Sequence, residues 1–482
     1  MLIFISLYSN NLIIGGKTMK LAYDIKDKPS FGKLLIFAFQ QLLAILAATI
    51  AVPAIVGNGM SQSAALFGAG VGTIVYLLFT KFRSPVFLGS SFAFLSSMGA
   101  AFAGAVSAEA GYAGIILGAI FAGLVYVVIA IIVKVAGVKW IDKIMPAVVI
   151  GPTVSIIGLS LAGNAIGDLG TGKVMKEVVE QVIQDGAIVD KVNMVSAASP
   201  YVCIICGLVT LFTVIICSVF GKKMAKLIPF IIGILAGYAV ASIFTVIGIK
   251  TDNLALQVID FSVFKGMTPF AVPDFTFINA AKGIKAIDGQ YIATIAVAYA
   301  PVAFVVFAEH IADHKNLSSV VNKELLEDPG LHRTLLGDGV GSMVGAVFGG
   351  CPNTTYGESV GCVAITGNAS IVTILCTAVM AMVISFFNPF VVFLSTIPNC
   401  VMGGVCITLY GFIAVSGLKM IQKVDLDQNK NLFVVAVILI AGIGGLSLSF
   451  GKVTLTEIAC ALILGIITNV IVSRKKDEVA AE

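Results

Sequence analysis

Apolar residues gather along this chain in runs of about 20, the length at which an α-helix crosses the hydrocarbon core of a bilayer. Short polar stretches separate the runs, so the pattern predicts a polytopic, all-α membrane protein with 14 transmembrane segments. The predicted spans cover residues 33–56, 61–80, 84–106, 112–137, 143–165, 199–219, 225–248, 291–313, 331–349, 351–367, 369–396, 401–421, 432–450 and 455–473.

Composition excludes a soluble protein. Hydrophobic residues make up 58% of the 482 residues and charged residues 12%, about half the charged fraction of an ordinary soluble domain. The net charge of +4 matters less than its placement, because lysine and arginine collect in the cytoplasmic connections of membrane proteins. They cluster before the first predicted span, after the second, fourth, sixth, eighth and twelfth, and after the last. We therefore expect both termini in the cytoplasm.

Three motifs occur twice in the same order, which indicates two copies of one unit. The pairs are "LFGAGVGTIV" from Leu66 with "LLGDGVGSMV" from Leu335, "SSFAF" from Ser90 with "TTYGE" from Thr354, and "PAVVIG" from Pro146 with "PNCVMG" from Pro398. Each pair matches predicted spans seven apart. Because seven is odd, the copies are expected to be inverted, an arrangement that places the substrate of many transporters between the copies near mid-membrane.

The predicted spans 84–106 and 351–367 contain helix breakers. Pro85 and Gly89 stand in the first, and Gly349, Gly350 and Pro352 precede or open the second. Each span is expected to begin as an extended strand and to become helical halfway across. The two helix starts would then offer free N–H groups and positive dipole ends to a polar ligand. Serine and threonine at 90, 91, 354 and 355 are candidate helix caps.

Carboxylates within apolar spans are the candidate functional groups, since they are costly there and usually contact a substrate, ion or proton path. Glu358 follows the helix breakers of the span 351–367, and Glu309 lies in "FVVFAEHIADHKNL". In that segment Glu309 and Asp313 share one helix face, and His310 and His314 share the neighbouring face. Asp313 and His314 are equally well interpreted as solvated cytoplasmic residues. For Asp338 we favour a helix-end or packing group.

Other chemistries are less well supported. Cys203 and Cys206 form a CxxC pair without a second pair or polar neighbours, so we expect no metal and no redox centre. No GxxxxGK[ST] motif is present, and the glycines of "GAGVG" and "GDGVG" have a spacing typical of helix packing. An intramembrane metalloenzyme using Glu309, His310 and His314 is an alternative, but the spacing is not HExxH. We expect a transporter without cofactor rather than an enzyme.

Three remaining segments carry predictions. The polar connections 166–198 and 249–290 are placed outside, and "GKVMKEVVEQVIQDGAIVDK" in the first is interpreted as a small solvated helix. The apolar residues 1–18 lack a secretory cleavage site. One hypothesis is that translation begins at Met19 and that residues 1–18 are not native. The alternative is a short N-terminal tail.

Four separated motifs, "LGSSFAF", "AEHIADH", "EDPGLHRTLLGDG" and "PNTTYGESVGCVAITG", resemble the bacterial uracil permeases of the nucleobase–ascorbate transporter family, also called nucleobase–cation symporters. The resemblance extends from Phe31 to Val472. It implies fourteen spans in two inverted repeats of seven, proton-coupled uracil import through the cytoplasmic membrane and a homodimer. No nucleic acid is expected among the partners.

The resemblance also implies a division into domains. A core domain would comprise residues 33–137 and 291–397, and a gate domain residues 138–290 and 398–473. Residues 1–32 and 474–482 would be cytoplasmic tails.

By position, Glu309 and Glu358 resemble the two substrate-binding glutamates, and Phe92, Tyr356, Gly357 and Ala48 resemble the other residues around the base. From the residues themselves, Glu309 is a candidate proton carrier, because desolvation favours its protonated form, and its titratable neighbours Asp313 and His314 are candidates for proton coupling. Independently, uracil carries two N–H donors and two carbonyl acceptors, which two carboxylates and the N–H groups of helix starts at 92–94 and 356–358 would complement, with Phe92 and Tyr356 against the ring.

Several positions depart from the family pattern. Gln40-Gln41 stands where Gln-His is common, Ser359 where asparagine is common, and Gly367 where arginine is common. Asp313 replaces the histidine of some uracil permeases, so the proton partner of Glu309 stays open. Xanthine or urate permeases are the nearest alternative, although many carry glutamine at the position of Glu358. A same-fold anion transporter is less favoured, because an anion fits poorly beside two carboxylates.

Overall fold

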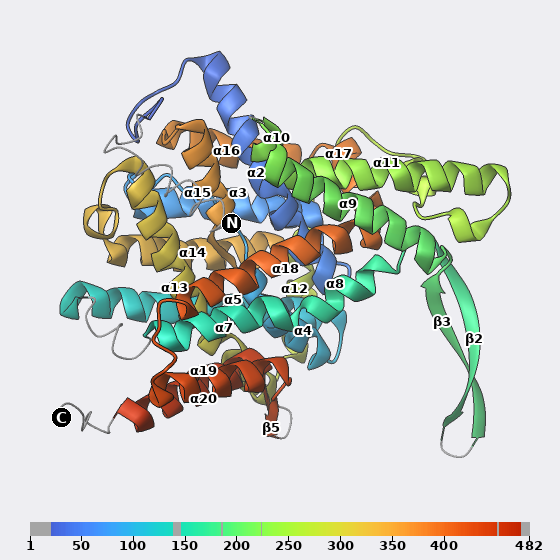
Figure 1. Ribbon diagram of the computed structural model, residues 1–482. Helices are drawn as coiled ribbons and strands as arrows, with labels where there is room; N and C mark the ends of the chain where they lie inside the picture. The colour runs from blue at the N-terminus through green and yellow to red at the C-terminus, as the bar shows by residue number, and fades with distance from the viewer. Residues whose placement is uncertain (1–20, 138–145, 185–186, 223, 451–452, 474–482) are drawn as a thin grey trace. The chain divides into compact units, whose positions relative to one another are not determined.

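The computed structural model describes residues 21–137, 146–184, 187–222, 224–450 and 453–473, and it is predominantly helical (Figure 1). Among these residues eight helices are long and apolar enough to cross a membrane. They are α2 (Phe31–Val56), α3 (Gln62–Phe79), α5 (Ala108–Ala136), α7 with α8 (Ala147–Leu169), α9 (Pro200–Phe220), α11 (Pro229–Lys250), α13 (Gly289–Val321) and α18 (Asn399–Ile421). The hypothesis about residues 1–18 falls outside the described residues.

Shorter elements fill the remaining predicted ranges. The helices are α4 (Leu95–Ala103), α10 (Met224–Leu227), α12 (Thr276–Gly283), α14 (Leu331–Gly349), α15 (Gly357–Thr366), α16 (Ile371–Ile384), α17 (Asn388–Thr396), α19 (Asn429–Ile443) and α20 (Glu457–Ser473). Short helical turns are η1 (Phe92–Phe94), η2 (Leu254–Leu256), η3 (Phe261–Phe264), η4 (Ile284–Ala286) and η5 (Leu326–Gly330). The strands are β1 (Leu88–Ser90), β2 (Met175–Gln184), β3 (Ala187–Ser196), β4 (Asn353–Thr355), β5 (Leu448–Phe450) and β6 (Val453–Leu455).

A helix lies in every predicted range, but not every range is one unbroken helix. The range 369–396 holds α16 and α17, and the second of these starts with a proline near its N-terminus, where proline is tolerated. The range 432–450 is helical only to Ile443, because Gly444 and Gly445 follow and Gly445 has a positive φ of 70°. The apolar residues after it form β5, so hydrophobicity alone overestimated this helix.

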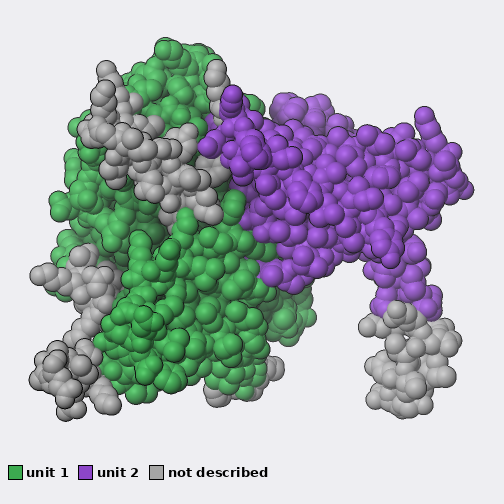
Figure 2. Space-filling model, viewed as in Figure 1, with its two compact units in different colours: residues 1–160, 272–386, 410–482 green, residues 161–271, 387–409 purple. Residues whose placement is uncertain are grey.

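The chain divides into two compact units (Figure 2). The first comprises residues 1–160, 272–386 and 410–482, and the second residues 161–271 and 387–409. All the residues that the sequence nominates for function fall in the first unit.

Helices α3 and α14, which carry the two copies of the glycine motif, pack closely against each other in the first unit. Gly72 and Gly341 occupy equivalent positions in the two copies. A Cβ on Gly72 would stand 2.7 Å from the carbonyl oxygen of Gly341, and a Cβ on Gly341 would stand 2.7 Å from that of Gly72. The prediction that these glycines serve close helix packing is confirmed.

The prediction of a small helix in the connection 166–198 is wrong. Strands β2 and β3 form an antiparallel hairpin there, in which Met175 pairs with Ser196 and Gln184 with Ala187 (Figure 1). Valine and isoleucine are frequent in both strands, and such β-branched residues favour extended backbone. The sequence signal was the Asp-Gly pair between the strands, which is typical of a two-residue hairpin turn.

Residues 21–27 lie along the end of α15 and are held there by backbone hydrogen bonds. The N–H of Ala22 donates to the carbonyl of Gly367 at 2.8 Å, and the N–H of Ala369 donates to that of Tyr23 at 2.9 Å. The Lys323 ammonium, just beyond α13, donates to Asp24 Oδ2 at 2.6 Å. This N-terminal strap therefore joins α13 and α15, the two helices that carry Glu309 and Glu358.

Docking of the strap is expected to weaken in acid. The hydrogen bond from Lys323 is the main reason that the pKa of Asp24 is lowered from its usual value. A lowered pKa in the docked state stabilises docking above the ordinary aspartate pKa, and this contribution is lost as pH falls through the lowered value. The effect is small, because both side chains are nearly half exposed. Spin labels at Lys28 and Lys315 should show a broader distance distribution in acid.

Variants of the ion pair separate this explanation from general acid unfolding. Asp24→Asn should have the broader distribution already at neutral pH, while Lys323→Arg should behave as the parent does. A narrow, pH-independent distribution in Asp24→Asn would contradict the role of the pair.

Candidate functional site

The two elements with helix breakers meet as extended strands. Strand β1 pairs antiparallel with β4, so that Gly89 lies opposite Thr354, and each strand leads into a short helix, α4 by way of η1 and α15 directly. Glycine is required at 89, since any Cβ there would overlap the ring of Tyr356. The two helix starts are thereby held beside each other, as the positions of the helix breakers predict.

The expected capping by serine and threonine is not observed. The N-cap of η1 is Ser91 and that of α15 is Tyr356, and neither makes a side-chain capping bond. Thr355 Oγ1 donates instead to Asp313 Oδ2 at 3.0 Å. Because the first N–H groups of a helix have no acceptor within the helix, the absence of side-chain caps at these two starts leaves those donors available to a ligand.

Tyr356 has a structural task that its sequence position did not indicate. Its ring is 4% exposed, its hydroxyl donates to the carbonyl of Ser90 at 2.8 Å, and its N–H donates to the carbonyl of Phe87 at 3.1 Å. The N–H of Tyr356 is therefore not one of the free donors. That of Gly357, the first residue of α15, remains.

The two glutamates come close together from α13 and α15. Glu309 is exposed although its neighbours Ala308 and His310 are buried, and Glu358 is half-buried in the first turn of α15. Their carboxylates interact electrostatically, and that of Glu358 bends back to its own backbone N–H. Two accessible carboxylates, one from α13 and one from α15, therefore lie close together.

The remaining nominated residues surround this region. Phe92 is half-buried at the start of η1, and its ring meets the edge of Tyr410 at a centroid distance of 6.0 Å. Ala48 is buried in α2, which packs against α15 and β1. Gly357 is buried and opens α15. The structure thus brings Glu309, Glu358 and these three residues into adjoining elements.

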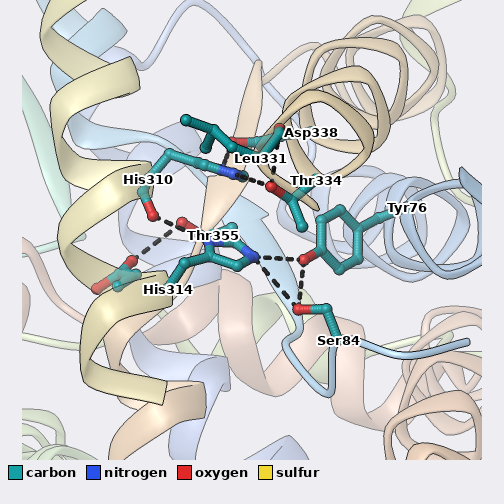
Figure 3. Close-up of polar contacts among 9 residues, drawn as sticks. Tyr76, Ser84, His310, His314, Leu331, Thr334, Asp338 and Thr355 are labelled. Carbon is teal, nitrogen blue, oxygen red and sulfur yellow. Dashed lines mark hydrogen bonds and ion pairs between the residues drawn. The ribbon is translucent and has the colours of Figure 1, made fainter. Parts of the chain in front are cut away.

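Asp313 and His314 are not solvated, so that interpretation is wrong. Asp313 is 5% exposed and His314 1% exposed. His314 Nε2 lies 2.7 Å from the Tyr76 hydroxyl and 3.2 Å from Ser84 Oγ, while its Nδ1 lies 2.9 Å from the carbonyl of His310 (Figure 3). The α13 helix continues to Val321, eight residues beyond the predicted end at 313, and α3 covers this face.

His310 and Asp338 form a buried pair that the sequence did not reveal. His310 Nδ1 lies 2.7 Å from Asp338 Oδ2 and Nε2 lies 2.9 Å from Thr334 Oγ1, and its ring stacks on that of His314 at 4.1 Å (Figure 3). Asp338 therefore lies inside α14 rather than at a helix end, and it is packed in the interior as a hydrogen-bond partner. The available signal was an acid in an otherwise apolar glycine motif, because a buried carboxylate needs a partner.

Ser359 provides a further link between the elements. Its hydroxyl lies 2.6 Å from Gln41 Nε2 of α2 and accepts the N–H of Phe87 at 2.9 Å. The residues that depart from the family pattern at 41 and 359 thus contact each other. Serine is short enough to accept the N–H of Phe87 while it contacts Gln41.

This arrangement suits a small, flat, polar molecule. Carboxylates accept hydrogen bonds from ring N–H groups, and uncapped helix starts donate to ring carbonyls. His310, Asp313 and Asp338 are buried, whereas Glu309 is exposed. Each ring nitrogen of His310 and His314 has a hydrogen-bond partner, which argues against their use in the alternative metalloenzyme.

Comparison with known proteins identifies the family. A family model described as the permease family matches residues 32–449. The chain belongs to this permease family. It is 38% identical over 451 residues to the uracil permease of Bacillus caldolyticus, covering 93% of this chain and 94% of that protein. It is 36% identical to the uracil permease of Bacillus subtilis, covering 96% and 97%, and 31% identical to that of Escherichia coli K12, covering 92% and 92%.

Solved structures show that the fold of this permease is that of known transporters. The transmembrane domain of the cyanobacterial bicarbonate transporter BicA matches with a TM-score of 0.59 at 16% identity, covering 93% of this chain and 100% of that chain. The murine anion transporter Slc26a9 matches with a TM-score of 0.60 at 11% identity, covering 98% and 75%. At these identities the likeness concerns the fold alone. Family and apolar helices together make the permease an integral membrane protein.

Proposed function

We propose that this permease imports uracil across the cytoplasmic membrane by proton symport. The observation that carries the proposal is the pair of neighbouring glutamates, Glu309 and Glu358, beside two uncapped helix starts. Relatives that match along almost the whole chain are named uracil permeases. Uracil has the matching set of groups, since its two ring N–H donors and two carbonyl acceptors lie on one small ring.

We assign a binding role to each residue of the candidate site. Glu358 and Glu309 accept from the ring N–H groups, and the N–H of Gly357 donates to a ring carbonyl. Phe92, half-buried at the other helix start, lies against the ring, and Ala48 limits the space on the side of α2. The ring of Tyr356 is buried, and its hydroxyl is bonded to the carbonyl of Ser90. This ring keeps β1 and β4 at the correct separation and forms part of the wall of the binding site.

Glu309 is the best candidate for the proton carrier. It is accessible, whereas the acid one turn further, Asp313, is buried and bonded to Thr355. Asp313 interacts electrostatically with Glu309 and with Glu358, so protonation at one carboxyl favours ionisation at another. We assign Asp313 and His314 supporting parts in the coupling.

We also propose the architecture that the sequence implies: fourteen spans in two inverted repeats, cytoplasmic termini, a core domain of 33–137 with 291–397, a gate domain of 138–290 with 398–473, and a homodimer. Two observations support the inverted repeats. The equivalent glycines 72 and 341 face each other, and the equivalent strands β1 and β4 run antiparallel.

Uptake into proteoliposomes tests the proposal. Radiolabelled uracil should accumulate when an inward proton gradient is imposed, and a protonophore should abolish the accumulation. Unlabelled 5-fluorouracil should compete and xanthine should not. Competition by xanthine but not by 5-fluorouracil would instead support the purine alternative, and bicarbonate-sensitive uptake without uracil binding would support an anion transporter.

A further inference from the structure

Besides Glu309 and Glu358, a third acidic residue is of interest. Glu457 contacts α4, the short helix that follows β1 and η1. Ser96 in α4 donates to Glu457 Oε1 at 2.7 Å, and Glu457 opens α20, a helix far away in sequence. Ser96 lies four residues beyond Phe92, which corresponds to about 6 Å along a helix axis. A side-chain bond therefore joins α20 to the half-helix whose start contributes to the candidate site.

Ser96 belongs to an accessible stripe on α4. Phe92 and Ser96 are partly exposed and Gly99 and Ala103 are exposed, whereas most of the residues between them are buried. The spacing of four, three and four places these residues on one face of a helix. A Cβ added to Gly99 would meet nothing within 4 Å. Open space therefore extends along α4 from Ala103, at its C-terminal end, to Ser96.

This stripe does not have the composition of a lipid-facing surface. Serine, glycine and alanine replace the large apolar residues that contact lipid, and the stripe carries a bond to a carboxylate, which is costly in lipid. Glu457 is held against the interior, since α20 and β6 both pack against α13, the helix of Glu309. The accessible face is therefore better explained as the wall of a path.

On the other side of Glu309 a second stripe follows α13 toward its C-terminal end. Glu309 and Ser319 are exposed and Ala312 and Asn316 are partly exposed, again at helical spacing. Gly361, one turn beyond Glu358 on α15, is also partly exposed, with nothing within 4 Å of an added Cβ. Accessible residues therefore extend from the two glutamates along α13 and α15 toward the predicted cytoplasmic side.

We propose that the Ser96–Glu457 bond is the outer latch of the transport path. In this structure the latch is closed, and the two glutamates are reached from the cytoplasmic side. Opening to the outside requires Ser96 and Glu457 to separate, and the substrate then passes along the Phe92, Ser96, Gly99 and Ala103 stripe. Glu457 acts as a positioning residue and does not bind substrate in the site. The inference rests on the proposed transport function and adds a residue to it.

Cross-linking tests whether separation is needed. In a cysteine-free background that still transports uracil, the double variant Ser96→Cys with Glu457→Cys is treated with a short bifunctional thiol reagent. We expect a cross-link that abolishes uptake while detergent-purified protein still binds uracil. The monofunctional form of the reagent serves as control. Uptake at the uncross-linked rate, or failure of the two cysteines to cross-link, would overturn the proposal.

Accessibility tests the latch without any need for transport. With a reporter cysteine at Phe92, Ser96→Ala should increase labelling by an impermeant thiol reagent from outside about tenfold, the expected effect of losing a hydrogen bond to a charged group. Ser97→Ala is the matched control, because Ser97 is the next residue on α4 but donates to the buried carbonyl of Ala298. Equal labelling in the two variants would show that the bond is only structural.

The two readouts keep the latch and the proposed function distinguishable. If the parent protein does not transport uracil, the proposed function fails, but the labelling difference between Ser96→Ala and Ser97→Ala still decides whether the latch exists. If the parent transports uracil and labelling is unchanged by Ser96→Ala, only the latch is wrong.

Discussion

Glu358→Gln is expected to weaken uracil binding by about 10- to 100-fold, the value of a hydrogen bond to a charged acceptor. The carboxylate accepts its own backbone N–H in the first turn of α15, next to the N–H of Gly357. Glutamine keeps one acceptor oxygen but adds an NH₂ group that cannot accept. It also removes the negative charge that the helix start favours.

Glu309→Gln is expected to have a different profile. Because the amide cannot titrate, gradient-driven accumulation should be lost almost completely, whereas binding should fall less than in Glu358→Gln. Glu309 is exposed and lies one turn from the buried Asp313, so the change leaves the Asp313–Thr355 bond in place. Substrate exchange without a gradient should persist in this variant.

Calorimetry and uptake on both variants separate recognition from coupling. If Glu309→Gln still accumulates uracil under a proton gradient, its coupling role is wrong. If Glu358→Gln binds uracil as the parent does, its recognition role is wrong. Asp313→Asn provides a comparison, since it conserves size next to Thr355 while it removes a second titratable group.

Gly72→Val is expected to prevent correct assembly of the first unit. A Cβ at this position would stand 2.5 Å from Asn353 Nδ2 and 2.7 Å from the carbonyl oxygen of Gly341, well inside ordinary contact distance. Overpacking of this kind costs about 1–3 kcal/mol or more. Here the clash also displaces the start of β4, which leads to Glu358. We expect loss of folded protein in detergent, measured by size-exclusion chromatography and thermal unfolding, and no uptake.

Two further glycine variants test whether close helix packing causes the expected defect of Gly72→Val. Gly341→Val should be as damaging, because its Cβ would meet the carbonyl oxygen of Gly72 at 2.7 Å and Leu88 Cδ1 at 2.8 Å. Gly163→Ala in α8 should be harmless, since nothing lies within 4 Å of its Cβ. Normal thermal stability of Gly72→Val would contradict the packing argument.

Local patterns in the sequence were sufficient to predict many of the helices and strands. Runs of apolar residues located the helices, and Pro85, Gly89, Gly350 and Pro352 marked the strands that precede α4 and α15. These features depend on neighbours along the chain, on backbone dihedral preferences and on length. The hairpin β2–β3 differs from the expected helix, because charged residues of both signs suggest a solvated helix while the Asp-Gly pair and the β-branched residues favour a hairpin.

The candidate site could be predicted only in part from local sequence patterns. Glu309 and Glu358 stood out because carboxylates are rare in apolar spans, and both are accessible in the structure. The burial of Asp313 and His314 could not be predicted from local sequence, because it depends on the continuation of α13 past them and on the contacts of His314 with Tyr76 and Ser84. The task of Tyr356 depended on Ser90, 266 positions earlier in the chain.

The sequence by itself determined that this is a helical membrane protein with repeated motifs, two interrupted spans and two prominent acids, because each of these follows from short-range pattern. Only the tertiary structure decided which polar groups are partners. The His310–Asp338, Asp313–Thr355, Gln41–Ser359 and Ser96–Glu457 contacts each join different elements. A hydrogen bond needs two atoms within about 3 Å, and that condition is met by the packing of whole helices rather than by local sequence.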